Sequence, residues 1–131
     1  MGYRVLRSDE HPWEERPPRE GQSLPRHIVD VTEHGALTES RARLWRLPPG
    51  TRGMRHSEGA QEEVFVVLEG TLTFLLGDPY ERFDVEPQSV VTVATNTALQ
   101  LRNESDADVV VFAYGAPPVT GRASYLDDVA L

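Results

Sequence analysis

Three ionisable side chains, His56, Glu58 and Glu63, lie close together near the middle of the chain. His56 and Glu58 are two positions apart, so on an extended backbone their side chains point to the same side. Glu63 opens an apolar segment and shares one side of an extended chain with Phe65 and Val67. If Phe65 and Val67 face a core, the three ionisable groups can converge at one end of it. An imidazole and two carboxylates in one place can transfer protons or hold a divalent cation.

The segments that must position these groups are short, apolar and separated by turn residues. Bounded by Gly, Pro or Asn, they are typical of strands in an antiparallel sandwich or barrel, and they cover residues 42–47, 63–68, 71–76, 90–93, 99–102 and 109–114. No stretch keeps apolar residues at helical spacing for three turns. A chain of 131 residues without cysteine has room for one domain and must rely on an apolar core. The sequence therefore predicts a single all-β domain.

The stretch around His56 matches the spacing of a known motif. Gly50 is followed by five residues and then His56, and Glu58 stands two positions further on. Four residues lead from there to Glu63, and six more lead to Gly70. The pattern resembles the first motif of the cupin superfamily, in particular of small single-domain type 2 cupins, where a second His occupies the position of Glu58. The flanking Pro-Pro-Gly and Val-Leu-Glu-Gly sequences are also similar to those of cupins.

The second cupin motif, which has two Gly, a Pro, a His and a final Asn, is only partly matched. When its final Asn is aligned with Asn103, Leu99 falls where the family has His. Gln88 and Asn96 fall at the two Gly positions, and Ala94 falls at the Pro position. Because Asn tolerates a left-handed backbone, Asn96 is expected to stand in for a Gly of the family's turn. The surrounding strand–turn–strand rhythm keeps the family's spacing.

The resemblance implies a cupin-type double-stranded β-helix, which is a jelly-roll barrel, built as a single domain from residues 40–118. Residues 1–39 are expected to form an N-terminal extended arm with one or more covering strands, because 8–26 is polar and broken by prolines. Residues 119–131 are expected to form a C-terminal tail.

The resemblance also implies how a metal ion would be held. The usual cupin metal is bound by two His and one Glu of the first motif and by one His of the second. Here His56 and Glu63 match, Glu58 replaces a His, and Leu99 cannot coordinate a metal. The sequence therefore favours a site without a cofactor. The alternative is a divalent ion, Mn, Ni, Zn or Fe, held by His56, Glu58 and Glu63.

Two carboxylates in a dry site need a compensating positive charge. In the absence of a metal, Arg41, Arg43 and Arg55 are the candidates for this role, or else Glu58 points to solvent. The competing interpretation of Arg41 and Arg43 is an ordinary solvated strand face.

Two functional hypotheses follow. In the first, the barrel binds a small apolar or amphipathic molecule in a pocket formed by His56, Glu58, Glu63, Phe65, Leu99 and Leu101. In the second, which the resemblance also allows, the protein is an enzyme of the isomerase, cyclase, lyase or dioxygenase type. Its catalytic candidates are His56 and Glu63, acting as acid and base with or without a divalent metal.

Composition excludes some partners. A formal charge of -8 repels phosphate backbones, so nucleic acid is not an expected partner. The longest apolar runs, 64–68 and 109–114, are far too short to cross a bilayer, and the N-terminus lacks an apolar signal core. The expected location is therefore the cytoplasm, with no membrane association.

The segment 64–68 bears on assembly, because both of its alternating faces are apolar. One face would line the barrel interior. The other must be covered by residues 1–40, by a second sheet of the same chain or by a second subunit. A homodimer is the expected form.

Overall fold

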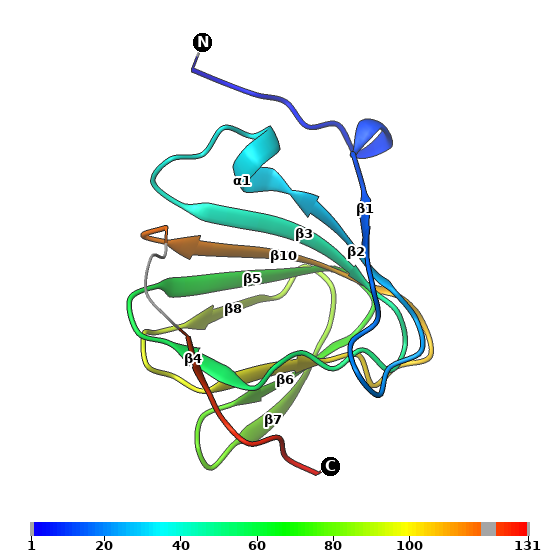
Figure 1. Cartoon of the computed structure of the whole chain (residues 1–131), viewed down its shortest axis with the longest axis vertical. Coiled ribbons are helices and arrows are strands. Elements are labelled where there is room, and N and C mark those ends of the chain that lie inside the picture. Colours follow the sequence, from blue (N-terminus) through cyan, green and yellow to red (C-terminus); the bar gives the residue numbers. More distant parts are fainter. Residues whose placement is uncertain (1, 119–122, 131) are drawn as a thin grey trace.

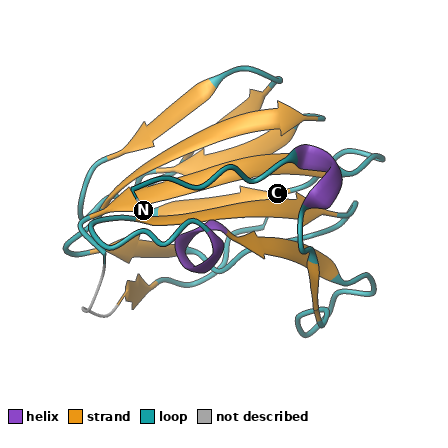
Figure 2. Cartoon of the chain, turned by 90° about the horizontal axis from the view of Figure 1, so that it is seen from above, coloured by secondary structure: helices purple, strands orange, loops and turns teal. Residues whose placement is uncertain are grey.

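Two antiparallel β-sheets face each other in the computed structural model of the chain, which describes residues 2–118 and 123–130. Figure 1 shows β3, β10, β5 and β8 in one layer and β4, β6 and β7 in the other. Figure 2 shows the N-terminal arm running across the strands of the first layer. The elements are η1 (Ser8–Glu10), β1 (Glu14–Arg16), β2 (Arg26–Asp30), α1 (Val31–His34), β3 (Arg41–Leu47), β4 (His56–Glu58), β5 (Glu62–Glu69), β6 (Leu72–Leu76), β7 (Glu81–Val85), β8 (Val90–Val93), β9 (Leu99–Arg102), β10 (Val109–Ala116) and β11 (Ala123–Tyr125).

The strand order shows that neighbours in the sheets are mostly distant in sequence. One sheet has the order β1-β2-β3-β10-β5-β8, and the other has the order β11-β4-β9-β6-β7. All six predicted strands are present, as β3, β5, β6, β8, β9 and β10, and their ends differ from the prediction by at most two residues. The all-β class is therefore confirmed. In the part of the chain that the structure describes, no helix is long and apolar enough to span a bilayer.

Five strands lie outside the six predicted ranges, although one or more covering strands were expected within residues 1–39. Two of them, β1 and β2, lie in the predicted arm, where β1 pairs with β2 and β2 pairs with β3. Another, β7, is almost wholly exposed and polar, and it pairs with β6 alone at the sheet edge. The last two, β4 and β11, have three residues each and pair with one another. The strands β1, β4, β7 and β11 are short or largely polar and form mainly by pairing with a neighbouring strand, whereas β2 also buries Ile28 and Val29.

The turn positions of the two motifs share a backbone with positive φ, the left-handed region. Gly50 and Gly70 have φ of 83° and 75°, and Asn96 has φ of 61°, as predicted. Gln88, at the other Gly position of the second motif, also has a positive φ of 71°. At Gly70 a Cβ atom would lie 2.7 Å from the Asp108 carbonyl oxygen, so both the conformation and the space require glycine.

The main core lies between the two sheets. It is formed by inward residues of β3 and of β5 to β10, including Phe65 and Val67 of β5, both of which are buried. The rings of Phe65 and Phe74 meet edge to face at 5.6 Å across the core. The inward alternation predicted for β5 is therefore present, and it places Glu63 on the same side as Phe65.

The outer face of the first sheet is covered over only part of its width. Trp13 of the arm and Val31 of α1 pack on a second cluster formed by Val29, Leu44 and Val110. Further along the sheet, on β5, β8 and β10, side chains stay exposed: Leu68 by 46%, Val90 by 59% and Tyr114 by 37%. The arm thus covers β2, β3 and part of β10 but not the far edge of the sheet.

Candidate functional site

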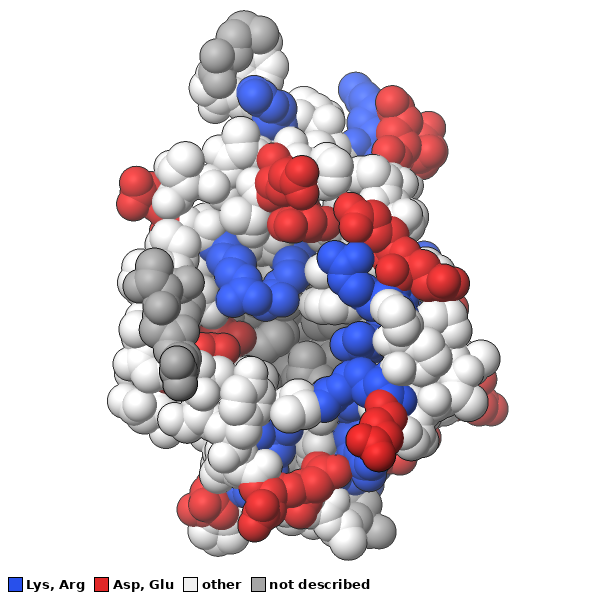
Figure 3. Space-filling view, viewed as in Figure 1, with Lys and Arg blue, Asp and Glu red and all other residues white. Residues whose placement is uncertain are grey.

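A cavity of about 300 Å³ lies between the sheets, and all six residues of the predicted pocket line it, namely His56, Glu58, Glu63, Phe65, Leu99 and Leu101. Trp45 and Leu47 of β3, Ala113 of β10 and residues of the arm complete its walls. Figure 3 shows a hollow in one face of the molecule with basic side chains gathered around it.

The cavity exists because β10 carries small residues where it faces inward. Ala113 of β10 is paired with Arg43 on one side and with Phe65 on the other. Only a methyl group therefore separates the inward side chains of β3 from those of β5 at this level. One step further along β10, Gly115 occupies the inward position, and the side chain of Gln61 fills the space that a Cβ atom would need. Gln61 is buried and donates a hydrogen bond to the Pro117 carbonyl.

His56 is held by its own loop in one tautomer. Its Nδ1 lies 2.9 Å from the Met54 carbonyl oxygen, which can only accept a hydrogen bond, so Nδ1 carries the proton. The other ring nitrogen, Nε2, keeps its lone pair in the neutral ring and lies 3.5 Å from Glu58 Oε1. Leu99 is the residue paired with His56 across β4 and β9, and it is 1% exposed.

Glu58 and Glu63 both turn toward the cavity. Only 13% of the Glu58 side chain is exposed, so it is not the solvated acid that one interpretation of the sequence allowed. Burial raises the pKa of Glu63, and the nearby Glu58 carboxylate raises it further. The His56 ring and the guanidinium groups of Arg43 and Arg41 act in the opposite direction on that pKa.

The residues present fit a metal site with three protein ligands. The Nε2 or Nδ1 atom of His56 and one carboxylate oxygen each of Glu58 and Glu63 lie within 4.8 Å of one another. The bond from Nδ1–H to a backbone carbonyl is the outer contact that commonly orients a metal-binding imidazole. One imidazole and two carboxylates suit a divalent ion, and Leu99 leaves the fourth ligand position of the family without a donor.

The structure changes the interpretation of the arginines. Arg41 and Arg43 are half-buried and line the cavity, so they are not a solvated strand face. Arg55 was a candidate for the same role, and this was wrong. Its guanidinium group lies 3.1 Å from Asp78 Oδ1 and 3.1 Å from the Asp127 carbonyl oxygen, and Arg55 does not border this cavity.

Two further arginines, Arg19 and Arg26, reach the cavity from the arm and were missed by sequence reasoning. Arg26 stands at the start of β2, beside the strand that carries Arg43. Arg19 lies in the turn between β1 and β2. No spacing rule links these positions to His56, because the contact arises only when the arm pairs with β3.

The C-terminal tail also contributes to the site. Strand β11 pairs with β4, so Ala123 and Tyr125 line the cavity, and the Tyr125 ring lies 6.2 Å from the His56 ring. Residues 119–122 of the predicted tail lie outside the described residues. The described part was expected only as a tail, since its three-residue strand is too short to be recognised in sequence.

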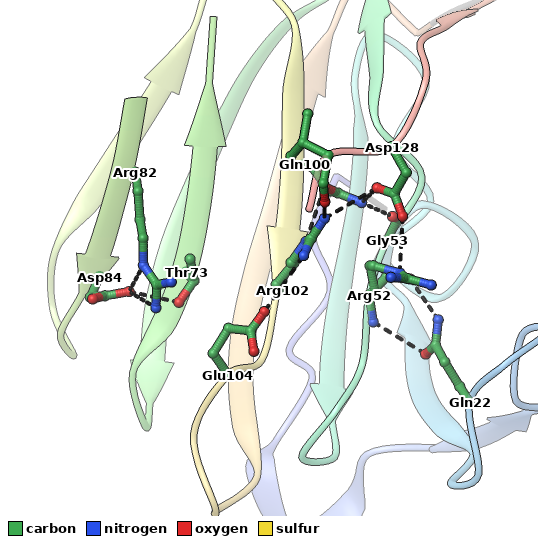
Figure 4. A network of polar contacts seen from close by, with 11 residues as sticks. Gln22, Arg52, Gly53, Thr73, Arg82, Asp84, Gln100, Arg102, Glu104 and Asp128 are labelled. Carbon is green, nitrogen blue, oxygen red and sulfur yellow. Dashed lines mark hydrogen bonds and ion pairs between the residues drawn. The ribbon is translucent and has the colours of Figure 1, made fainter. Parts of the chain in front are cut away.

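A polar network fixes this tail (Figure 4). Asp128 accepts hydrogen bonds from Gln100 and Arg102 of β9, with 3.3 Å to the Arg102 Nη2 atom. Its other oxygen lies 3.1 Å from Arg52 Nε. Arg102 additionally donates to the Val129 carbonyl. These contacts place β11 against the mouth of the cavity.

Solved structures share the fold. A sugar phosphate isomerase from a cupin superfamily of Silicibacter pomeroyi DSS-3 is similar with a TM-score of 0.72 and 22% identity, covering 95% of this chain and 83% of that one. A predicted oxalate decarboxylase from Thermotoga maritima has a TM-score of 0.73 and 17% identity, covering 87% and 99% of the two chains. An uncharacterised conserved protein with a double-stranded β-helix domain from Klebsiella pneumoniae has a TM-score of 0.70 and 15% identity, covering 95% and 98%.

The family is shown by sequence as well. No curated protein is a detectable relative of the chain by sequence. The family model of the cupin domain, however, matches residues 43–114, more than half of the chain, and this match includes His56, Glu58, Glu63 and Leu99. Together with the two facing antiparallel sheets, it confirms the double-stranded β-helix. The chain belongs to the cupin family.

Proposed function

We propose that this cupin binds a small molecule in the cavity between its sheets. The observation that carries the proposal is a hollow of about 300 Å³ that joins an apolar floor to a polar end. Phe65, Leu99 and Leu101 belong to the floor, and His56 and Glu63 belong to the polar end. At ~30 Å³ for a water-sized group, the hollow takes a compound of roughly ten non-hydrogen atoms.

The structural neighbours support a small, oxygen-rich ligand. Two of them are named for a sugar phosphate and for oxalate, both of which are small and rich in oxygen. Polar groups at one end of an apolar pocket fix the orientation of such a compound, while the apolar floor supplies burial.

This binding function does not require the usual metal. Burial raises the pKa of Glu63, and Arg41 and Arg43 oppose this rise from within the same cavity, which is part of the compensation that two buried carboxylates need. The proposed resting state therefore has His56, Glu58 and Glu63 balanced by arginines.

A cavity-filling variant tests the proposal. A panel of small polyols, hydroxy acids and sugar phosphates is first screened by thermal shift, and hits are measured by calorimetry. Ala113→Leu places extra side-chain volume between Arg43 and Phe65 and is expected to abolish binding of a hit. Thr92→Leu, at an exposed position of β8, is the matched control and is expected to bind normally. A panel with no hit, or a hit that Ala113→Leu binds unchanged, contradicts the proposal.

A second candidate function, acid–base catalysis on the bound molecule, is favoured by the fixed tautomer of His56. Its Nε2 lone pair is available as a base, whereas burial favours the protonated form of Glu63, which can act as an acid. Both side chains face the same hollow. Given a substrate from the panel above, His56→Ala and Glu63→Gln are each expected to lower kcat at least about a hundredfold. Turnover that survives both substitutions rules this candidate out.

A divalent metal at His56, Glu58 and Glu63 would supply Lewis-acid chemistry to the same site. The close approach of the three ligand atoms supports it. Elemental analysis of untagged protein, after Mn, Ni, Zn and Fe are each offered, decides the question. About one ion per chain, lost in Glu58→Gln and Glu63→Gln, supports the metal, and less than about a tenth of an ion excludes it.

A further inference from the structure

We propose that the ligand of the cavity is a small organic anion, and that Arg26, Arg41 and Arg43 recognise its carboxylate or phosphate group. This inference rests on the small-molecule binding proposed above and names the class of ligand. It requires that the cavity hold more positive charge than is needed to neutralise its own carboxylates. It also requires that the guanidinium groups have N–H groups free to donate hydrogen bonds to a ligand.

The charge balance of the cavity is opposite to that of the chain. The chain carries a formal charge of -8, yet four arginines and only two carboxylates line this hollow: Arg19, Arg26, Arg41, Arg43, Glu58 and Glu63. Counted over these arginines and carboxylates, the lining has a net positive charge, and Figure 3 shows basic side chains gathered around the opening. A cleft of one sign within a molecule of the other sign attracts small ions of opposite charge.

Within the described part of the chain, these arginines form no ion pair. Among the described residues, no carboxylate oxygen lies within 4.0 Å of the guanidinium nitrogens of Arg19, Arg26, Arg41 or Arg43. Arg46 offers a direct comparison, since it lies on β3 together with Arg41 and Arg43 but points to the opposite face of the sheet. It contacts Glu69 at 3.8 Å and Asp108 at 3.9 Å. Compensation of Glu58 and Glu63 alone would not need four cations.

Trp45 holds two of the guanidinium groups in place. The Cζ atoms of Arg26 and Arg43 lie 5.5 Å and 6.0 Å from the centre of the Trp45 ring. Stacking of this kind satisfies the face of a guanidinium and leaves its N–H edges to donate. Arg26 gives one N–H to the Pro17 carbonyl, and its buried Nε has no partner among the described residues.

Holding these like charges together is unfavourable without an anion. Burial lowers the pKa of Arg43, and the neighbouring Arg41 lowers it further, although the carboxylates of Glu63, Asp30 and Glu58 oppose this shift without reversing it. Burial also lowers the pKa of Arg26, with additional repulsion from Arg19 and Arg16. An oxyanion that accepts paired N–H bonds removes this repulsion, and guanidinium groups match the geometry of carboxylate and phosphate oxygens.

The strand order also indicates which functional groups the ligand has besides its anionic group. Arg41 and Glu63 flank Gly115 on opposite sides of β10, so the arginines of β3 and the carboxylate of Glu63 lie side by side on one sheet, separated by the width of one strand. A compound anchored at the arginines therefore presents its next carbon atoms to His56 and Glu63. These two side chains suit a hydroxyl or carbonyl group, which makes hydroxy acids and phosphorylated polyols the expected ligands.

Four probes of matched size test the inference by calorimetry: malate, its neutral diamide malamide, glycerol 3-phosphate and glycerol. The account predicts that at least one anion binds while its neutral partner does not. Arg41→Gln and Arg43→Gln are each expected to weaken that binding roughly ten- to a hundredfold, as expected for loss of hydrogen bonds to a charged group. Arg46→Gln, the control on the outer face, is expected to bind as the wild type does.

Arg43→Lys separates loss of binding from loss of folding, because it keeps the positive charge but lacks the planar guanidinium group. Its affinity for the anion is expected to lie between that of the wild type and that of Arg43→Gln. Malate and glycerol 3-phosphate separate a carboxylate from a phosphate ligand. If neutral probes bind as tightly as anions, or if the arginine variants bind anions normally, the inference is overturned while cavity binding stands. If none of the four probes binds, the inference is also overturned, and the Ala113→Leu test on the wider panel decides the proposed function separately.

Discussion

At the scale of single residues, Leu99 sets this chain apart from the metal-binding pattern of its family. It is paired directly with His56 across two strands and is fully buried in the cavity wall. Because a hydrocarbon side chain cannot bind a metal, the polar end of the cavity offers only three possible metal ligands, His56, Glu58 and Glu63. The wall beside these ligands is apolar.

Restoring an imidazole at this position is expected to create a stronger metal site. Leu99→His would add a second nitrogen donor opposite His56, so the affinity for Zn²⁺ should rise at least about tenfold over the wild type. Thr92→His, at an exposed position of β8 outside the cavity, is the control and should change the affinity little. Calorimetric titration with Zn²⁺ gives both values, and equal affinities in the two variants would show that residue 99 does not face the three donors.

At the same scale, sequence reasoning found His56, Glu58, Glu63, Phe65 and Leu99, because one local motif and the two-residue period of a strand fix their positions. It could not find Arg19 and Arg26. Their approach to the cavity depends on pairing of the arm with β3, and no local pattern in a proline-broken segment encodes that pairing.

At the scale of elements, the turn between β5 and β6 depends on Gly70. A side chain there meets both a left-handed backbone and the Asp108 carbonyl oxygen. Gly70→Ala is expected to lower the free energy of unfolding by roughly 2–4 kcal/mol. Gly50→Ala, with the same sign of φ but open space around its Cβ position, should lower it by only about 1 kcal/mol. Urea unfolding compares the two, and equal losses would mean that the contact with Asp108 is relieved without cost.

The docking of β11 depends on the charge of Asp128. Partial burial raises the pKa of this carboxyl, but the Gln100 hydrogen bond and the charges of Arg52 and Arg102 outweigh it, so the net shift is downward. The ionised form is therefore favoured in the folded state. Its stabilising effect is complete above the unfolded value of 3.8 and is lost as the pH falls through the lower folded value.

Asp128→Asn should remove this effect at neutral pH. The variant is expected to show faster amide hydrogen exchange at 123–125, whereas Asp127→Asn, whose contact with Arg55 uses only the backbone carbonyl, should not. In the wild type, the NMR signals of these residues should change as the pH is lowered below about 4. Unchanged exchange in Asp128→Asn would show that other contacts hold the tail.

Elements differ in how far sequence predicts them. The six strands with apolar inward rows were predicted to within two residues, because burial of alternate residues leaves a clear pattern. The strands β1, β4, β7 and β11 are short or polar and exist by pairing with a neighbour, so composition does not mark them.

At the scale of the whole molecule, the uncovered strip on β5, β8 and β10 predicts association with a second copy. Leu68, Val90 and Tyr114 remain exposed there, although the arm buries the other part of the same sheet face. Leu68→Glu combined with Val90→Glu should convert a homodimer to a monomer in light scattering after size exclusion. Leu24→Glu, on the exposed arm, is the control. A monomeric wild-type protein would contradict the prediction.

The central claim is that a small molecule binds beside His56, inside the barrel. The imidazole signals of the four histidines in a two-dimensional NMR spectrum test it most directly, because His56 is the one histidine among the described residues that lines the cavity. On saturation with an anionic probe that binds, the account predicts a shift of the His56 signals while those of His11, His27 and His34 stay in place. A bound probe that leaves His56 unchanged would contradict it.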